Sequence, residues 1–135
     1  MANALFDPGR EGFLDGTIDW DTFAIKACLV RSAYTFVASH KFMNDITPAT
    51  NVNGRTADLG TKTVTNGVAD AADTSLVTSD AVACNAIVIF YDTASDATAR
   101  LIAYIDTATG LPFTPAASQT VNIAWDNGAN KIFKL

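Results

Sequence analysis

The stretch CNAIVIFY, residues Cys84–Tyr91, decides the fold. Apolar side chains occupy both its even and its odd positions, which is typical of a strand that is covered on both faces. A polar turn follows at Asp92–Ala97, and a second apolar run follows at Arg100–Asp106. Asp, Ser and Thr at the ends of such runs favour tight turns. The pattern therefore predicts an antiparallel hairpin in the interior of the protein.

Two more strand-like segments complete the sequence after a Gly/Pro loop. Val121–Trp125 is followed by the turn Asp126–Asn130 and by a short final run. The last fifty residues thus predict a ladder of four strands joined by turns. An edge strand with free backbone groups can pair with another chain. The predicted interface strand consists of Lys131, Ile132, Phe133, Lys134 and Leu135.

A short helix is predicted over Asp7–Gly16, near the start of the chain. Asp7 can cap free amides, Pro8 suits the first helical position, and Gly16 suits the exit. Glycines within the segment weaken it, so the prediction depends on apolar residues that seat the helix on a sheet.

A half-buried strand is predicted over Thr22–Val30, after a short strand or bridge at Ile18–Trp20. Lys26 lies on its polar face. The opposite, apolar face carries Phe23, Ile25, Ala27 and Leu29.

The middle of the chain has weaker patterns. Tyr34–Ile46 predicts a short helix that ends before Pro48, and Ala49–Asn53 predicts a loop. Thr-rich residues at Gly54–Thr65 predict exposed strands, and Asn66-Gly67 is a two-residue hairpin turn signal. One further strand is predicted near Ser75–Thr78.

Together these segments predict one β-rich domain over residues 1–135. A chain of this length can bury one core without a disulfide or a metal. Many short strands with turns and few helices favour a mainly β fold. We expect an antiparallel β-sandwich or Greek-key barrel with one or two short helices.

The charge of the chain argues against several classes of partner. The net charge is −5, the pI is about 4.5, and 17% of the residues are charged. Scattered Lys and Arg residues argue against nucleic acid, and no basic amphipathic or long apolar segment favours a membrane. The first residues lack the features of a signal peptide. We expect synthesis in a reducing cytoplasm. The abundant small, uncharged Ala and Thr residues suit packing against other copies and equally suit a monomer with Thr-rich loops.

Candidate catalytic residues are few. His40 is the only histidine and Glu11 the only glutamate. A catalytic triad needs a histidine next to an activated nucleophile, and the sequence contains no nucleophile-elbow motif. Aromatic neighbours favour a structural role for His40. The sequence predicts no enzyme, no catalytic residue and no cofactor.

The other polar and sulfur-containing candidates are predicted to have structural roles. Asp92, Asp96 and Asp106 carry oxygen ligands of the kind calcium prefers, but their spacing does not match a calcium loop, and turn capping is the favoured reading. Cys28 and Cys84 read as small buried hydrophobic residues. A disulfide between them is conceivable only if their strands are neighbours. No metal site is predicted.

Four aromatic residues lie on the strands of the ladder or beside them: Tyr91, Tyr104, Trp125 and Phe133. Such residues usually fill a core or a subunit contact. A stacking platform for sugars is the alternative.

Three stretches carry a resemblance to a known group. These are Gly60–Asp73, Leu101–Pro112 and Trp125–Phe133. They resemble small virion proteins of tailed bacteriophages, in which an N-terminal helix precedes a strand like Phe23–Val30. The resemblance spans most of the chain.

The resemblance implies a structural protein of the virion. Size and β content favour a capsid decoration or cement protein that binds the major capsid protein without covalent bonds. Such proteins sit at points of local symmetry, so a homo-oligomer, with a trimer favoured, is expected. A head–tail connector, a tail-tip protein or a receptor-binding protein, including one that binds glycans, is the alternative. A small cell-wall hydrolase is a third class that the poor supply of acids and bases disfavours.

Overall fold

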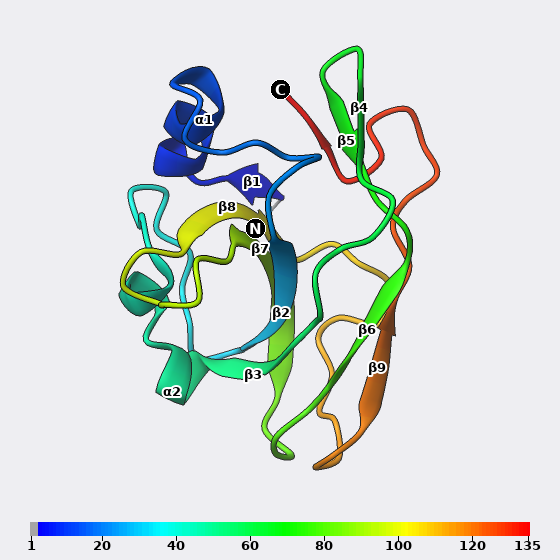
Figure 1. The fold of residues 1–135 in the computed structure, drawn as a ribbon. Helices are drawn as coiled ribbons and strands as arrows, with labels where there is room; N and C mark the ends of the chain where they lie inside the picture. Colours follow the sequence, from blue (N-terminus) through cyan, green and yellow to red (C-terminus); the bar gives the residue numbers. More distant parts are fainter. Residues whose placement is uncertain (1–2) are drawn as a thin grey trace.

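A computed structural model describes residues 3–135 as two packed layers of antiparallel strands with two short α-helices (Figure 1). Within these residues the strands form one large sheet and two small ones. The predicted mainly β, antiparallel class with short helices is confirmed.

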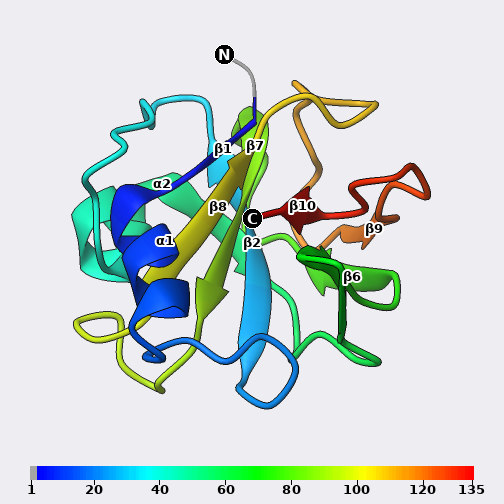
Figure 2. The ribbon, with the colours of Figure 1, turned by 90° about the horizontal axis from the view of Figure 1, so that it is seen from above.

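The large sheet forms the centre of the molecule. Its strand order is β1-β8-β7-β2-β3. The strands are β1 (Ala4–Leu5), β8 (Arg100–Ile105), β7 (Cys84–Tyr91), β2 (Ile25–Arg31) and β3 (Val52–Arg55). The predicted hairpin of β7 and β8 is confirmed, with Ile87 opposite Ile105. Figure 2 shows the helices on one side of this sheet and the small sheets on the other.

β2 differs from its prediction because both of its faces are covered. Ile25, Ala27 and Leu29 face the core between the two layers, as expected. Cys28 and Val30 are also fully buried, in a second core on the opposite face. The prediction of a half-buried strand was therefore wrong, because a single Lys26 on that face does not make the face exposed.

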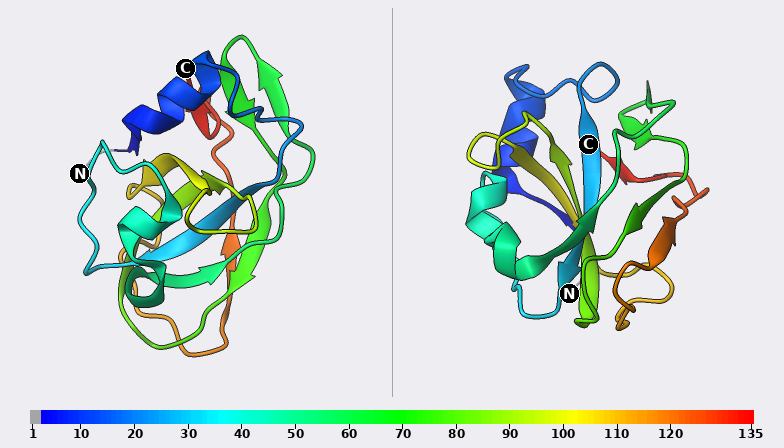
Figure 3. Two further views of the ribbon diagram at one scale, coloured as in Figure 1. Left: turned by 60° about the vertical axis from the view of Figure 1, so that its left-hand side comes forward. Right: turned by 60° about the horizontal axis from the view of Figure 1, so that its bottom comes forward.

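The second layer consists of a three-stranded sheet in the order β10-β5-β4 and a two-stranded sheet of β6 and β9 (Figure 3). The strands are β4 (Thr63–Thr65), β5 (Val68–Asp70), β6 (Thr74–Val77), β9 (Thr120–Ile123) and β10 (Phe133–Lys134). β9 pairs with β6 and β10 pairs with β5, so the predicted continuous ladder of four C-terminal strands is wrong. Alternation identifies a strand, but it does not identify the strand's partner.

Helix α1 (Asp7–Leu14) packs against β8. Asp7 is its first helical residue and Phe6 is the N-cap, so the predicted cap by Asp7 is wrong. Gly16 has a φ of 79° just after the helix, as its predicted exit role requires. A glycine is needed at position 9 of this helix, because a Cβ atom there would lie 2.7 Å from the carbonyl oxygen of Leu101.

Four other expectations need correction. Ile18–Trp20 forms no strand and enters a turn. The predicted helix over Tyr34–Ile46 is only a 3-10 turn at its end, and the predicted loop after it contains α2 (Pro48–Asn51) and the start of β3. Tertiary contacts decide these short segments, since their local patterns are weak. The Gly54–Thr65 segment is only partly strand, and Leu59 within it is buried.

We predict that Gly9→Ala destabilises the protein. Alanine normally favours a helix, but here its methyl group collides with the backbone of β8. Overpacking of this kind costs about 1–3 kcal/mol. Thermal unfolding measures the effect, with Glu11→Ala on an exposed position of α1 as the control. An unchanged or raised midpoint for Gly9→Ala would show that the helix can move away from the sheet.

Candidate functional site

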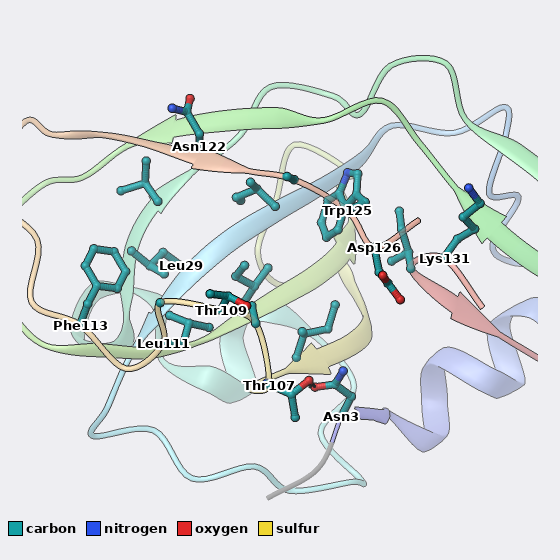
Figure 4. Close-up of a pocket in the computed structure, with 18 residues that line it drawn as sticks. Asn3, Leu29, Thr107, Thr109, Leu111, Phe113, Asn122, Trp125, Asp126 and Lys131 are labelled. Atoms are coloured by element: carbon teal, nitrogen blue, oxygen red, sulfur yellow. Dashed lines mark hydrogen bonds between the residues drawn. The ribbon is translucent and has the colours of Figure 1, made fainter. Parts of the chain in front are cut away.

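A groove of about 750 Å³ lies between the two layers (Figure 4). Its floor belongs to the central sheet and contains Leu29, Ile87 and Ile105. Leu29 and Ile87 are almost completely buried. The floor is therefore part of a rigid core.

One wall of the groove is the segment after β8. Leu111 and Phe113 turn apolar side chains towards the groove, and Thr107 and Thr109 lie at its edge (Figure 4). Phe113 exchanges two backbone hydrogen bonds with Cys84 of β7, at 2.8 and 3.0 Å, which anchors the far end of the wall.

Asn3 anchors the near end of the same wall. Its side-chain oxygen accepts hydrogen bonds from the backbone N–H groups of Asp106 and Thr107 and from the hydroxyl of Thr107. These contacts join the start of the chain to the exit of β8, more than a hundred residues later. The wall is thus held at both ends.

The opposite wall is formed by β9 and the residues after it. Trp125 is only 8% exposed, and its indole N–H donates to the carbonyl of Ala72 at 3.1 Å. Its backbone N–H donates to the carboxylate of Asp73 at 2.9 Å. Asp126 and Lys131 bring charge to the mouth of the groove beside this ring (Figure 4).

This arrangement suits binding by shape rather than chemistry on a substrate. The lining is mostly apolar, and ligand grooves of this kind fix orientation with a few polar groups at the rim. β9 is hydrogen-bonded to a neighbouring strand on one side only. The groove's volume of about 750 Å³ can hold apolar side chains of a partner. Apolar Leu111 and Phe113 within a loop are the sequence signal that could have indicated it.

The predicted interface strand, Lys131–Leu135, is built into the fold of its own chain. The N–H of Ile132 donates to Ala69 at 3.1 Å, and the N–H of Leu135 donates to Gly67 at 3.0 Å. The Phe133 ring packs edge-on against Trp20, with 5.2 Å between ring centroids. Lys131 and Ile132 also line the groove. A role in binding partners stays a prediction for this strand.

His40 lies in a half-buried position, where its Nδ1 is 2.9 Å from the hydroxyl of Tyr34. Burial raises the pKa of Tyr34 to about 12, so the hydroxyl stays protonated and shares a hydrogen bond with the ring nitrogen. This contact gives His40 a structural partner.

The two cysteines are free and buried. Their strands are neighbours, but Cys28 lies opposite Val88 and Cys84 lies opposite Arg31. The two side chains belong to different cores, on opposite faces of the sheet. Burial raises the pKa of both thiols, that of Cys28 to about 12, which keeps them unreactive.

Two of the acidic turn residues, Asp92 and Asp96, are held in ion pairs. Asp92 accepts from Lys26, and both carboxylate oxygens of Asp96 accept from Arg55, at 2.7 and 2.9 Å. These pairs tie the turn after β7 to β2 and β3. Among residues 3–135, no three His, Cys, Asp or Glu side chains gather closely enough to hold a metal ion.

The four aromatic residues considered as a stacking platform do not lie together. Tyr91 stacks on Phe23, with 4.9 Å between ring centroids. Tyr104 belongs to the core on the helical side of the sheet, while Phe133 packs against Trp20 on the other side. Of the four, Trp125 alone lines the groove.

Comparison with protein-family models, with curated proteins and with solved structures finds no match to this chain. In the part of the chain that the structure describes, no helix has the length and apolar character needed to cross a membrane.

We predict that deleting Lys131–Leu135 destabilises the fold. The deletion removes β10 and the ring that covers Trp20. Loss of a large apolar side chain from a packed site costs about 2 kcal/mol or more. The thermal midpoint of the truncated chain should fall, whereas Lys134→Ala at an exposed position of the same strand should change it little. A truncated chain with an unchanged midpoint would show that this strand does not contribute to the stability of the fold.

We predict that the Arg55–Asp96 ion pair makes the stability of the fold depend on pH in the acid range. Hydrogen bonds from Arg55 hold the pKa of Asp96 below its usual range. A depressed folded pKa gives stability that is present above the unfolded pKa of about 3.9 and is lost as the pH falls below it. Asp96→Asn should therefore lower the thermal midpoint at neutral pH, and the gap to the wild type should narrow as the pH falls below about 3.9.

Circular dichroism melts across this pH range measure the effect. Asp126→Asn, at the exposed mouth of the groove, is the control and should show no such convergence. A constant gap for Asp96→Asn at all pH values would contradict the proposed linkage.

Proposed function

We propose that this chain is a structural protein of a tailed-phage virion, and most specifically a capsid decoration or cement protein. The observation that carries the proposal is the spatial convergence of the three resembling stretches, Gly60–Asp73, Leu101–Pro112 and Trp125–Phe133. The third stretch contacts the first through hydrogen bonds beside the three-stranded sheet, and it faces the second across the groove.

Specific contacts make this convergence. The first and third stretches are joined by the hydrogen bond from the Trp125 indole to Ala72 and by the one from Ile132 to Ala69. The second and third stretches form facing parts of the groove, through Leu111 and Trp125 (Figure 4). Two of the three stretches therefore line the groove and the first is hydrogen-bonded to the third, which supports the groove as the binding surface in this proposal.

The proposed mechanism is mechanical. The rigid central sheet presents a fixed groove, with Asp126 and Lys131 at its mouth, to the major capsid protein, and apolar partner side chains fill the groove. Individual contacts can be weak because many copies bind one shell together. In this proposal the protein acts as a non-enzymatic homo-oligomer, with a trimer as the form the resemblance favours, and it is made in the host cytoplasm and incorporated in the virion.

The copy number in purified particles tests whether the protein decorates the capsid. Quantitative mass spectrometry against the major capsid protein should find on the order of hundreds of copies for a shell whose symmetric positions are filled. A few copies per particle would overturn the decoration role and favour a neck or tail position.

A substitution at the groove tests whether the groove is the surface that binds the particle. Thr109→Trp places a large ring at the groove edge and should weaken binding to particles that lack the protein by about tenfold or more, or about 1.4 kcal/mol. Thr114→Trp, at an exposed position outside the groove lining, is the matched control. Equal binding by the two variants would remove the groove from the proposed interface.

A further inference from the structure

Strand β4 ends the three-stranded sheet with an open edge. Thr63, Val64 and Thr65 are all exposed, and Val64 is 55% exposed although it is apolar. The strand joins β5 through Asn66 and Gly67, whose φ angles of 53° and 77° match a two-residue hairpin turn. Figure 1 shows this hairpin projecting at the top of the molecule.

The backbone groups of Val64 point away from the sheet. The carbonyls of Gly67 and Ala69 accept hydrogen bonds from the two residues that flank β10, Leu135 and Ile132, so Gly67 and Ala69 face β10. Successive residues of a strand alternate in direction, and Val64 lies opposite Ala69. Val64 therefore forms a non-hydrogen-bonded pair with Ala69 and turns its N–H and C=O to the open edge.

The edge is complementary to itself. The sequence Thr63-Val64-Thr65 reads the same in both directions. Antiparallel pairing about a two-fold axis at Val64 sets Val64 against Val64 of the second copy, with two reciprocal hydrogen bonds. It also sets Thr63 against Thr65 of the second copy, and Thr–Thr and β-branched pairs are favourable cross-strand neighbours. A closed two-fold contact needs this kind of self-matching patch.

Charge also favours a second copy at this edge. The chain carries a net charge of −5, so two copies repel wherever carboxylates meet. Residues 62–66 contain one lysine and no acid, and in the paired register Lys62 lies opposite the uncharged Asn66 of the second copy. The contact therefore brings the two acidic chains together at a segment free of negative charge.

Other strand edges are less open. The Phe133 ring of β10 contacts Phe13 of α1, with 5.8 Å between ring centroids. On the side of β3, Thr56 bridges to Leu76 of β6. β1 has only two residues, and β9 faces the groove.

We propose that two copies of this chain associate through antiparallel pairing of β4 with β4, which merges their three-stranded sheets into one continuous sheet. The contact is smaller than the roughly 1,200 Å² of a stable interface, so it is a weak association in dilute solution. It becomes effective where copies are held close together, as on a symmetric assembly. The proposal depends only on the edge and does not rest on a virion role.

Disulfide trapping of Val64→Cys tests the register. Paired strand residues with mutual hydrogen bonds have Cα atoms about 5.5 Å apart, within disulfide reach, and only residue 64 meets its own copy. Val77→Cys is the matched control, since Val77 is 57% exposed on another strand. The native Cys28 and Cys84 are buried and should contribute no background.

At equal concentration and oxidant, the Val64→Cys protein should form covalent dimers at least about tenfold faster than the Val77→Cys protein, because paired strands hold the two thiols within disulfide range. In the trapped dimer, the amide of residue 64 should exchange with solvent more slowly than in the reduced protein, because it becomes hydrogen-bonded. Equal trapping rates overturn the proposal. So does a trapped dimer in which that amide exchanges as fast as in the reduced protein.

Discussion

The structure depends on the burial of both faces of the hairpin formed by β7 and β8 and of its neighbour β2. Val88 and Phe90 of β7 face the core beneath the helical segments, while Ile87 and Ile89 face the second layer. A strand covered twice removes roughly twice the apolar area from water, at about 25 cal/mol per Å². This pairing allows the rest of the fold to consist of short elements that would be unstable alone.

The second layer buries one face of these central strands, except at the groove. β6 and β9 cover part of the central sheet, but the wall after β8 lies apart from β9 and leaves the groove between them. Hydrogen bonds at Asn3 and at Phe113 hold that wall in position. The groove is therefore a fixed feature of the packing, and its rigid floor makes it suitable for binding without rearrangement.

The two surfaces proposed for association have different physical characters. The groove offers apolar volume with a charged mouth, which suits a partner of different sequence. The β4 edge offers backbone hydrogen bonds and a palindromic Thr-Val-Thr run, which suits a second copy. They lie on different elements, so binding of a partner and pairing of copies can be varied independently by substitution.

The sequence by itself determined the β class, the bounds of β7, the Asn66-Gly67 turn and the burial of the cysteines, because local periodicity and turn chemistry encode them. The tertiary structure alone decided that β9 and β10 pair with strands outside the central sheet. It also decided that Cys28 and Cys84 lie on opposite faces of that sheet and that Leu111 and Trp125 line one groove. Strand partners and cavities arise from contacts between distant segments. Alternation along one segment carries no information about such contacts.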